Sequence, residues 1–306
     1  MHFGENRVKL KSDRAPFPFS TLILLAFLLL CLAMLSAPSL AAKKPTVLVI
    51  ESYHSSYLWD MDYTRALKDG LSDIADLQFF QLDTKRLPPS DYQQRADLAW
   101  QRYLDTNPDL VILGDDNALK YLANRFISTA TPVIYLGINN NPRHYFSEQL
   151  NNITGVLERP LLRRSIAYIR EIMAERLKKV LILFDDGTTA QTLLQEEFNG
   201  ESQRTIGSIT THIKLIGDIE VWKTAIAQAP AQGYDAIVVG LYHTINSAAG
   251  EHVPAEEILH WTSNHSKLPL FAFWRFAVGE NKTIGGLVLD GYVQGELAAG
   301  LARDVL

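Results

Sequence analysis

Short apolar runs alternate with longer amphipathic segments along most of this 306-residue chain. The runs are rich in Val, Ile, Leu and Phe, which is typical of strands buried on both faces of a parallel sheet. Between them, apolar residues such as Tyr63, Leu67 and Leu71 recur at helical spacing. An α/β fold of parallel sheets covered by helices is therefore predicted. The predicted strands are 47–50, 77–82, 110–113, 133–136, 180–184, 209–215, 236–239, 270–273 and 287–289.

A hydrophobic leader precedes the first predicted strand. Basic residues come before an apolar stretch at 21–35, and small residues follow it at 39–42. The stretch is short for a membrane span, and this order of features is typical of a signal peptide. We expect residues 1–42 to be removed by cleavage after Ala41 or Ala42, which places the mature protein in the periplasm. An uncleaved N-terminal anchor is the alternative.

The charge and the cysteine content narrow the function classes. The formal net charge is −5, and it becomes −7 without residues 1–42, which carry four basic and two acidic side chains. No basic stripe is present, so a nucleic-acid partner is not expected. Cys31, the one cysteine, lies in the leader without the small preceding residue of a lipoprotein signal. The mature chain therefore has no disulfide, and its stability depends on core burial.

The strand pattern divides into two groups. A polar passage after the fourth predicted strand indicates a first crossing between lobes near Gly155, and a second crossing is expected at 279–286. The final predicted strand and a helix starting near Gln294 would then return to the first group. We predict an N-terminal lobe of residues 43–155 plus 280–306 and a C-terminal lobe of residues 156–279.

Several of these segments also carry a family resemblance. Their order and spacing resemble the uncharacterised ABC-transporter substrate-binding family, which has a periplasmic binding protein type I-like fold with two Rossmann-like lobes. The resemblance spans nearly the whole mature chain, although family members commonly continue beyond the helix in which this sequence ends at Leu306. The matching segments are 47–57, 109–114, 132–137, 152–156, 234–239 and 268–271. Residues 51–59 also resemble extracytoplasmic sensing domains of bacterial signalling proteins.

The family resemblance implies a soluble binding protein. It would capture a small molecule between two closing lobes and deliver it to an ABC permease in the inner membrane. The alternative is an accessory module that reports the ligand to a signalling protein.

Physical reasoning places the ligand at the same cleft, because ligands of open parallel sheets lie beyond the carboxyl ends of the strands. The polar and aromatic residues found there are the candidate ligand-binding residues. They are Ser52, Tyr53, His54, Tyr57 and Trp59 after the first strand, Asp115 and Asp116 after the third, Asn139 and Asn140 after the fourth, and Asp185, Tyr242, His243, Trp274, Arg275 and Asp290 in the second half.

The chemistry of these residues suggests a ligand class. Aromatic side chains supply flat apolar walls with polar tips. The guanidinium of Arg275 could bind a carboxylate through two hydrogen bonds, and Asp115, Asp116 or Asp290 could balance an ammonium group. This combination suits an amino-acid-like zwitterion, although the same residues could hydrogen-bond a sugar or a nucleoside. Each also has a structural alternative: Ser52 and Asp116 in helix-leading turns, the histidines on the surface, and the tryptophans in the core.

Catalysis has no positive support in the sequence. Asp60 and Asp62 are two residues apart and would diverge on a helix, which makes them a poor acid–base pair. No Gly-x-Ser-x-Gly elbow, His-Glu-x-x-His motif or glycine-rich phosphate loop occurs, and the eight histidines lack metal-ligand spacing. We therefore expect a binding protein with no enzymatic activity, no cofactor and no metal.

Overall fold

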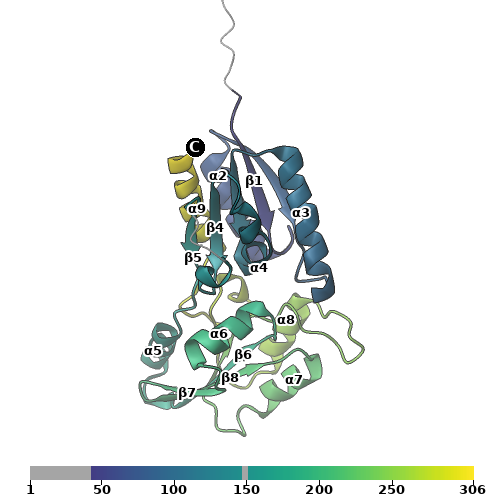
Figure 1. Cartoon of the computed structure of the whole chain (residues 1–306). Coiled ribbons are helices and arrows are strands. Elements are labelled where there is room, and N and C mark those ends of the chain that lie inside the picture. The colour runs from purple at the N-terminus through teal and green to yellow at the C-terminus, as the bar shows by residue number, and fades with distance from the viewer. Residues whose placement is uncertain (1–42, 147–150) are drawn as a thin grey trace, which may run out of the picture. The chain divides into compact units, whose positions relative to one another are not determined.

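The computed structural model describes residues 43–146 and 151–306 (Figure 1). The predicted signal peptide, its cleavage position and Cys31 lie outside the described residues. Within the described part the strands form two five-stranded sheets, in the orders β2-β1-β3-β4-β5 and β10-β9-β6-β8-β7. We call each sheet, with the helices packed on it, the first lobe and the second lobe.

All strand pairs of the first sheet are parallel. Residues 47–50 of the predicted first strand are fully buried, as expected for an apolar run in the middle of a parallel sheet. The strands are β1 (Thr46–Glu51), β2 (Asp76–Gln81), β3 (Leu110–Gly114), β4 (Val133–Ile138) and β5 (Ile153–Leu157). The helices between them are α2 (Leu58–Leu71), α3 (Tyr92–Thr106) and α4 (Asp115–Leu122), and single 3-10 turns lie at Pro89–Asp91, Ala123–Phe126 and Pro142–His144.

The second sheet is parallel except at one edge. Strand β7 pairs antiparallel with β8 through a two-residue turn at Gly207 and Ser208, where Gly207 has a φ of 61°. Its strands are β6 (Lys179–Phe184), β7 (Gln203–Ile206), β8 (Ile209–Leu215), β9 (Ala236–Val239) and β10 (Leu270–Ala272). The accompanying helices are α5 (Leu162–Met173), α6 (Thr188–Phe198), α7 (Ile219–Gln228) and α8 (Ala255–His265), with 3-10 turns at Ala174–Arg176 and Arg275–Ala277.

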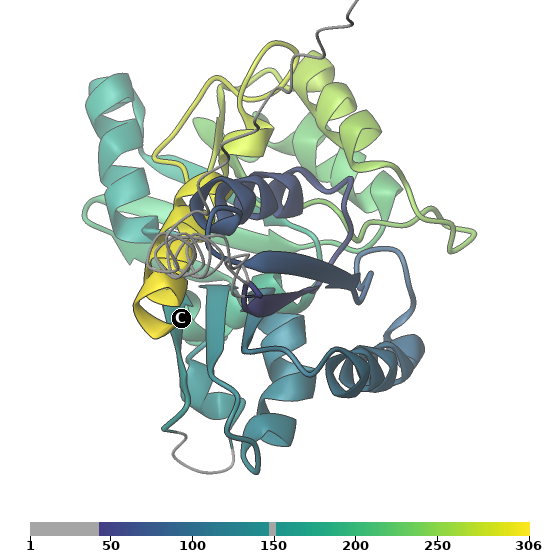
Figure 2. The same cartoon turned by 90° about the horizontal axis from the view of Figure 1, so that it is seen from above.

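The last helix, α9 (Gly291–Val305), packs against α2 of the first lobe and also contacts β4 and β5. Figure 2 shows this yellow helix beside the purple and teal elements of the first lobe. Asp290 begins the helix, because its side chain accepts a hydrogen bond from the backbone N–H of Tyr292. Small residues allow the close packing: a Cβ on Gly295 would lie 2.8 Å from the Cβ of Ala66.

Three segments differ from the predicted strands. Strands β5 and β7 were not predicted, since both are short edge strands of mixed polarity. Gly155 lies inside β5, so the chain leaves the first sheet after Leu157. The predicted strand at 287–289 is not a regular strand; its Leu289 forms an isolated bridge with Trp274 beside β10. Gly285 and Gly286, with φ values of 147° and 153°, interrupt regular pairing there.

In the described ranges, no helix combines the length and the apolar character that crossing a lipid bilayer requires.

Candidate ligand-binding site

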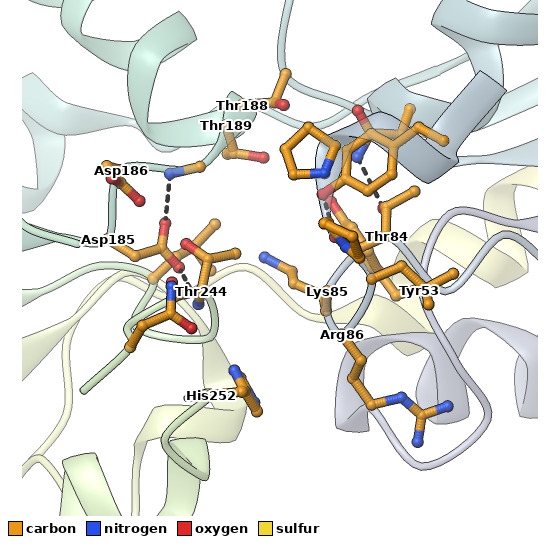
Figure 3. Close-up of a pocket in the computed structure, with 18 of the residues that line it drawn as sticks. Tyr53, Thr84, Lys85, Arg86, Asp185, Asp186, Thr188, Thr189, Thr244 and His252 are labelled. Atoms are coloured by element: carbon orange, nitrogen blue, oxygen red, sulfur yellow. Dashed lines mark hydrogen bonds between the residues drawn. The ribbon is translucent and has the colours of Figure 1, made fainter. Parts of the chain in front are cut away.

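A cavity of about 650 Å³ lies between residues of the two lobes (Figure 3). We call it the central cavity. The first lobe lines it with residues that follow β1, β2 and β3, and the second lobe with residues that follow β6 and β9. These are the carboxyl ends of parallel strands, where open α/β sheets bind ligands. Tyr53, Thr84, Lys85, Asn117, Asp185, Thr189 and Thr244 are among the lining residues.

Asp185 organises the second-lobe wall of the central cavity. Its side chain is 0% exposed, and one carboxylate oxygen accepts hydrogen bonds from the backbone N–H groups of His243 (2.8 Å) and Thr244 (3.2 Å). The other oxygen accepts from the N–H of Gly187 at 3.2 Å. Asp185 therefore ties the β6–α6 turn to the loop after β9, and its charge is compensated by backbone dipoles.

A small inner cavity of about 10 Å³ adjoins the central one. Two tryptophans from opposite lobes donate hydrogen bonds to buried carboxyl groups in it. The indole N–H of Trp59 donates to Asp115 Oδ2 (3.1 Å), and that of Trp274 donates to Glu158 Oε1 (2.5 Å). The second of these bonds joins the two lobes. Asn139 Nδ2 also donates to Glu158 Oε2 at 3.3 Å.

Burial controls the acidity of three carboxyl groups: Asp115 and Glu158 at the inner cavity, and Asp60, on which the charge of Asp115 acts. It raises the pKa of Asp60, Asp115 and Glu158 well above the usual values, and repulsion between neighbouring carboxylates raises each pKa further. Asp115 also has a φ of 68°, in the left-handed region that costs a non-glycine residue about 1 kcal/mol or more. Strained residues and perturbed carboxyl groups tend to gather at functional sites.

Glu51, at the end of β1, makes stability depend on pH. Its side chain is 2% exposed, and burial raises its pKa from 4.5 to about 7, while the nearby Gln81 and Lys68 lower it by less. The folded state thus holds this proton more tightly than the unfolded state does. The stability from Glu51 is complete below pH 4.5 and is lost as the pH rises to about 7.

Replacing Glu51 with Gln should remove this part of the pH dependence. Above neutral pH we expect Glu51→Gln to be more stable than the parent by about 2 to 3 kcal/mol. Below the pKa of a free glutamate side chain we expect the two proteins to be equally stable. Urea unfolding across this range measures the difference, with the exposed Glu171→Gln as control. Parallel curves for the parent and Glu51→Gln would contradict the assignment.

A second cavity of about 570 Å³, the side cavity, opens next to the central one. Lys85, Arg86 and His252 line both cavities. The ring of Tyr57 in the first lobe contacts His243 of the second lobe edge-on, with centroids 4.7 Å apart, and lies 5.8 Å from Phe276. This aromatic contact bridges the lobes beside the two cavities.

Most of the residues predicted from strand ends line one of these three cavities. They are Tyr53, His54, Tyr57, Trp59, Asp115, Asn139, Asp185, Tyr242, His243 and Trp274. Burial lowers the pKa of His243 well below its usual value, which keeps its imidazole neutral.

Five predicted residues line none of the three cavities and have structural contacts instead. The Ser52 hydroxyl donates to the carbonyl of Gly114 and accepts from the N–H of Ala118. Asp116 accepts from the backbone N–H groups of Asn139 and Asn140 and from the hydroxyl of Tyr145, and the side chain of Asn140 also bonds Tyr145. The Arg275 side chain is 69% exposed and lies 3.5 Å from Asp290.

Sequence reasoning missed several cavity residues. Thr84 and Lys85 follow β2, a predicted strand whose end was not searched. Glu158 follows β5, which was not predicted, so its position at a strand end was hidden. Thr244 lies one residue beyond the predicted His243, and the strand-end rule could have found it.

The described part of the chain contains no group of three or more His, Cys, Asp or Glu side chains placed to hold a metal ion.

Comparison with known proteins places this geometry in a structural class. No protein-family model matches the sequence, and no curated protein matches it. Solved structures do match. The ABC domain from Streptococcus pneumoniae in complex with L-Trp has 17% identity and a TM-score of 0.62, with 86% of this chain and 85% of that chain covered.

Two further structures show how widely this fold is used. An ABC transporter solute-binding protein from Mycobacterium smegmatis with bound glycerol has 11% identity and a TM-score of 0.54, covering 86% of this chain and 88% of that chain. The transcription regulator CcpA of Lactococcus lactis has 14% identity and a TM-score of 0.55, covering 86% and 91%. At such identities the likeness establishes the fold. The predicted two-lobed α/β fold of the periplasmic binding protein type I kind is therefore confirmed.

Proposed function

We propose that this chain is an extracytoplasmic solute-binding protein that holds a small molecule between its lobes and delivers it to an ABC permease in the inner membrane. The central cavity carries the proposal, because both lobes line it at their strand ends. Two buried polar atoms there, Asn117 Oδ1 and Thr244 Oγ1, have no hydrogen-bond partner among the described residues. A ligand would supply those partners.

The size and lining of the cavity suit this role. A volume of about 650 Å³ is in the range of small-molecule sites, and the walls combine three tyrosine rings with many polar and charged side chains. Structural neighbours with bound L-Trp and glycerol support a binding role over catalysis. An amino-acid-like ligand is the first class to test, given the zwitterion predicted from the sequence. We propose the lobe division predicted from the sequence, 43–155 with 280–306 and 156–279, with its first crossing moved to the residues after Leu157, where β5 ends.

Native mass spectrometry tests the proposed function. The full-length gene is expressed with its own leader, and the protein is recovered from the periplasm without denaturation. We expect a complex that carries one small molecule, which denaturation releases for identification. The same spectrum gives the mass of the mature chain and so tests cleavage after Ala41 or Ala42. Protein that carries no small molecule and binds none from a periplasmic extract would contradict the proposal.

A sensing role is the second candidate, because the regulator CcpA shares the fold. In that case the ligand-loaded protein would bind a membrane signalling protein instead of a permease. Crosslinking of the loaded protein in its own host, followed by identification of the membrane partner, separates the two roles.

A further inference from the structure

Lys85 is held rigidly at the edge of the central cavity. The preceding residue, Thr84, donates from its backbone N–H (3.0 Å) and from its hydroxyl (2.8 Å) to the carbonyl of Ser52. Asn117 Nδ2 donates to the Thr84 hydroxyl at 2.8 Å, and the hydroxyl of Tyr92 donates to the Thr84 carbonyl at 2.5 Å. Hydrogen bonds to Ser52, Asn117 and Tyr92 thus hold Thr84 in place, and this fixes the position of the adjacent Lys85 backbone.

The Lys85 side chain is buried and forms no ion pair, although its charge lowers the pKa of Asp60 and of Asp115. Lys85 is 9% exposed, and its ammonium lies over the rings of Tyr53 (4.7 Å) and Tyr57 (5.5 Å). Among residues 43–146 and 151–306, no carboxylate forms an ion pair with it and no hydrogen bond from it is found. Burying a charge in this way is costly unless something compensates it. Figure 3 shows the side chain extending into the cavity toward the second lobe.

The surroundings of Lys85 carry basic groups and two acidic ones, Asp185 and the exposed Asp186, and Arg86 is paired with Asp83. Arg86, Lys120 and His252 line the same cavity. The pKa of His252 is lowered, first by burial and then by the charges of Arg86 and Lys85. The carboxylate of Asp185 is already compensated by three backbone N–H groups, as described above.

The facing wall belongs to the second lobe and offers hydrogen-bond donors. Helix α6 starts at Thr188, and both Thr188 and Thr189 line the cavity at its N-terminus, where unpaired N–H groups and the helix dipole favour anions. Its N-cap residue, Gly187, provides no side chain to cap these groups. The hydroxyl of Thr244 is buried there without a partner and can donate a hydrogen bond.

We propose that the ligand of the central cavity carries an anionic group, a carboxylate or a phosphate, which binds Lys85 of the first lobe and the α6 N-terminus with Thr244 of the second. This inference rests on the proposed function and names the ligand class of the same cavity. The anion would join the lobes and so favour their closure around the ligand. It also moves the anion-binding role from Arg275, which is exposed and paired with Asp290, to Lys85.

Matched ligand pairs test the charge requirement. Isothermal titration calorimetry compares carboxylates with their amides (L-tryptophan with L-tryptophanamide, succinate with succinamide) and a phosphate monoester with its alcohol (glycerol 3-phosphate with glycerol). The ligand recovered by mass spectrometry is added with its own neutral analogue. We expect binding by an acid or a phosphate ester, and a loss of at least about tenfold when the anion is neutralised. The two kinds of pair distinguish carboxylate from phosphate.

Lys85→Met tests the residue. We expect it to weaken binding of the anionic member about 30-fold or more and to leave the neutral analogue unchanged. Lys85→Arg, which keeps the charge, should retain most of the affinity. Lys267→Met removes an exposed lysine that lines none of the three cavities and should change affinity less than about threefold. Thermal unfolding of each variant checks that it folds.

Two results would overturn the inference while leaving a ligand-binding function intact. One is a bound ligand without an anionic group, or a neutral analogue that binds as tightly as the anion. The other is a folded Lys85→Met variant that binds the anionic ligand as tightly as the parent. Failure of every compound and of the periplasmic extract to bind would instead contradict the proposed function itself.

Discussion

Replacing Gly295 with leucine is expected to lower the free energy of unfolding by about 4 kcal/mol, one of the largest effects available in this chain. Gly295 is buried where α9 crosses α2. A Cβ there would lie against the backbone carbonyl of Tyr63 and 2.8 Å from the Cβ of Ala66. Because the nearest atom belongs to the backbone of a packed helix, a side chain can be accommodated only if α9 moves away.

Gly300 provides the matched control on the same helix. It is exposed, and a Cβ there would meet no atom within 4 Å. Gly300→Leu is therefore expected to raise stability by up to about 1 kcal/mol through helix propensity. Urea unfolding of both variants measures the difference. Similar effects at the two positions would show that α9 does not pack closely on α2.

Replacing Asp185 with alanine is expected to cost about 4 kcal/mol, because three backbone N–H groups would lose their shared acceptor in a buried turn. Those groups belong to Gly187, His243 and Thr244. Two of these residues line the central cavity, so we also expect weaker ligand binding in any variant that still folds. Thermal and urea unfolding measure the first effect, and calorimetry measures the second.

The neighbouring Asp186 provides a control that separates the effect of losing the Asp185 hydrogen bonds from the effect of losing a negative charge. Asp186 is exposed and lines the same cavity. Asp186→Ala removes the same charge from the same turn, and we expect a change in stability below about 0.5 kcal/mol. An equal loss of stability in both variants would mean that the Asp185 hydrogen bonds do not hold the turn together.

The strands of the two sheets were predictable where they are central and apolar. Strands β1, β3, β6 and β9 are each a continuous buried run, and a run of this kind has few alternatives to a parallel sheet. Edge strands carry a weaker signal. Strand β5 is only half buried, and β7 has three polar residues followed by a single buried Ile206. Both were missed because an edge strand needs only one apolar face.

The candidate site was predictable in outline, because strand order alone brings the carboxyl ends of parallel strands to one edge. The strand-end rule therefore found Tyr53, Trp59 and Trp274. It could not tell which polar residues face a ligand and which hold the loops. Ser52 and Asp116 have the same residue types as ligand contacts, but their oxygens are already bonded to backbone N–H groups, a distinction that depends on three-dimensional positions.

Lys85 is a cavity residue whose burial the sequence could not predict. In the sequence it is one basic residue in a run with Arg86, a pattern that usually marks a solvated loop. Its burial follows from Tyr53 and Tyr57, which come from a different loop and lie beneath the ammonium. A contact between distant segments of this kind leaves no periodic trace in the sequence.

The packing of α9 on α2 also has a consequence for the order in which the chain can fold. Helix α2 ends at Leu71 and its partner begins at Gly291, so residues 72–290 separate the two. A chain that has emerged only as far as the second sheet still lacks the cover for Tyr63 and Ala66. The first lobe is therefore among the last parts to be completed, and the second lobe can fold before α9 packs on the first.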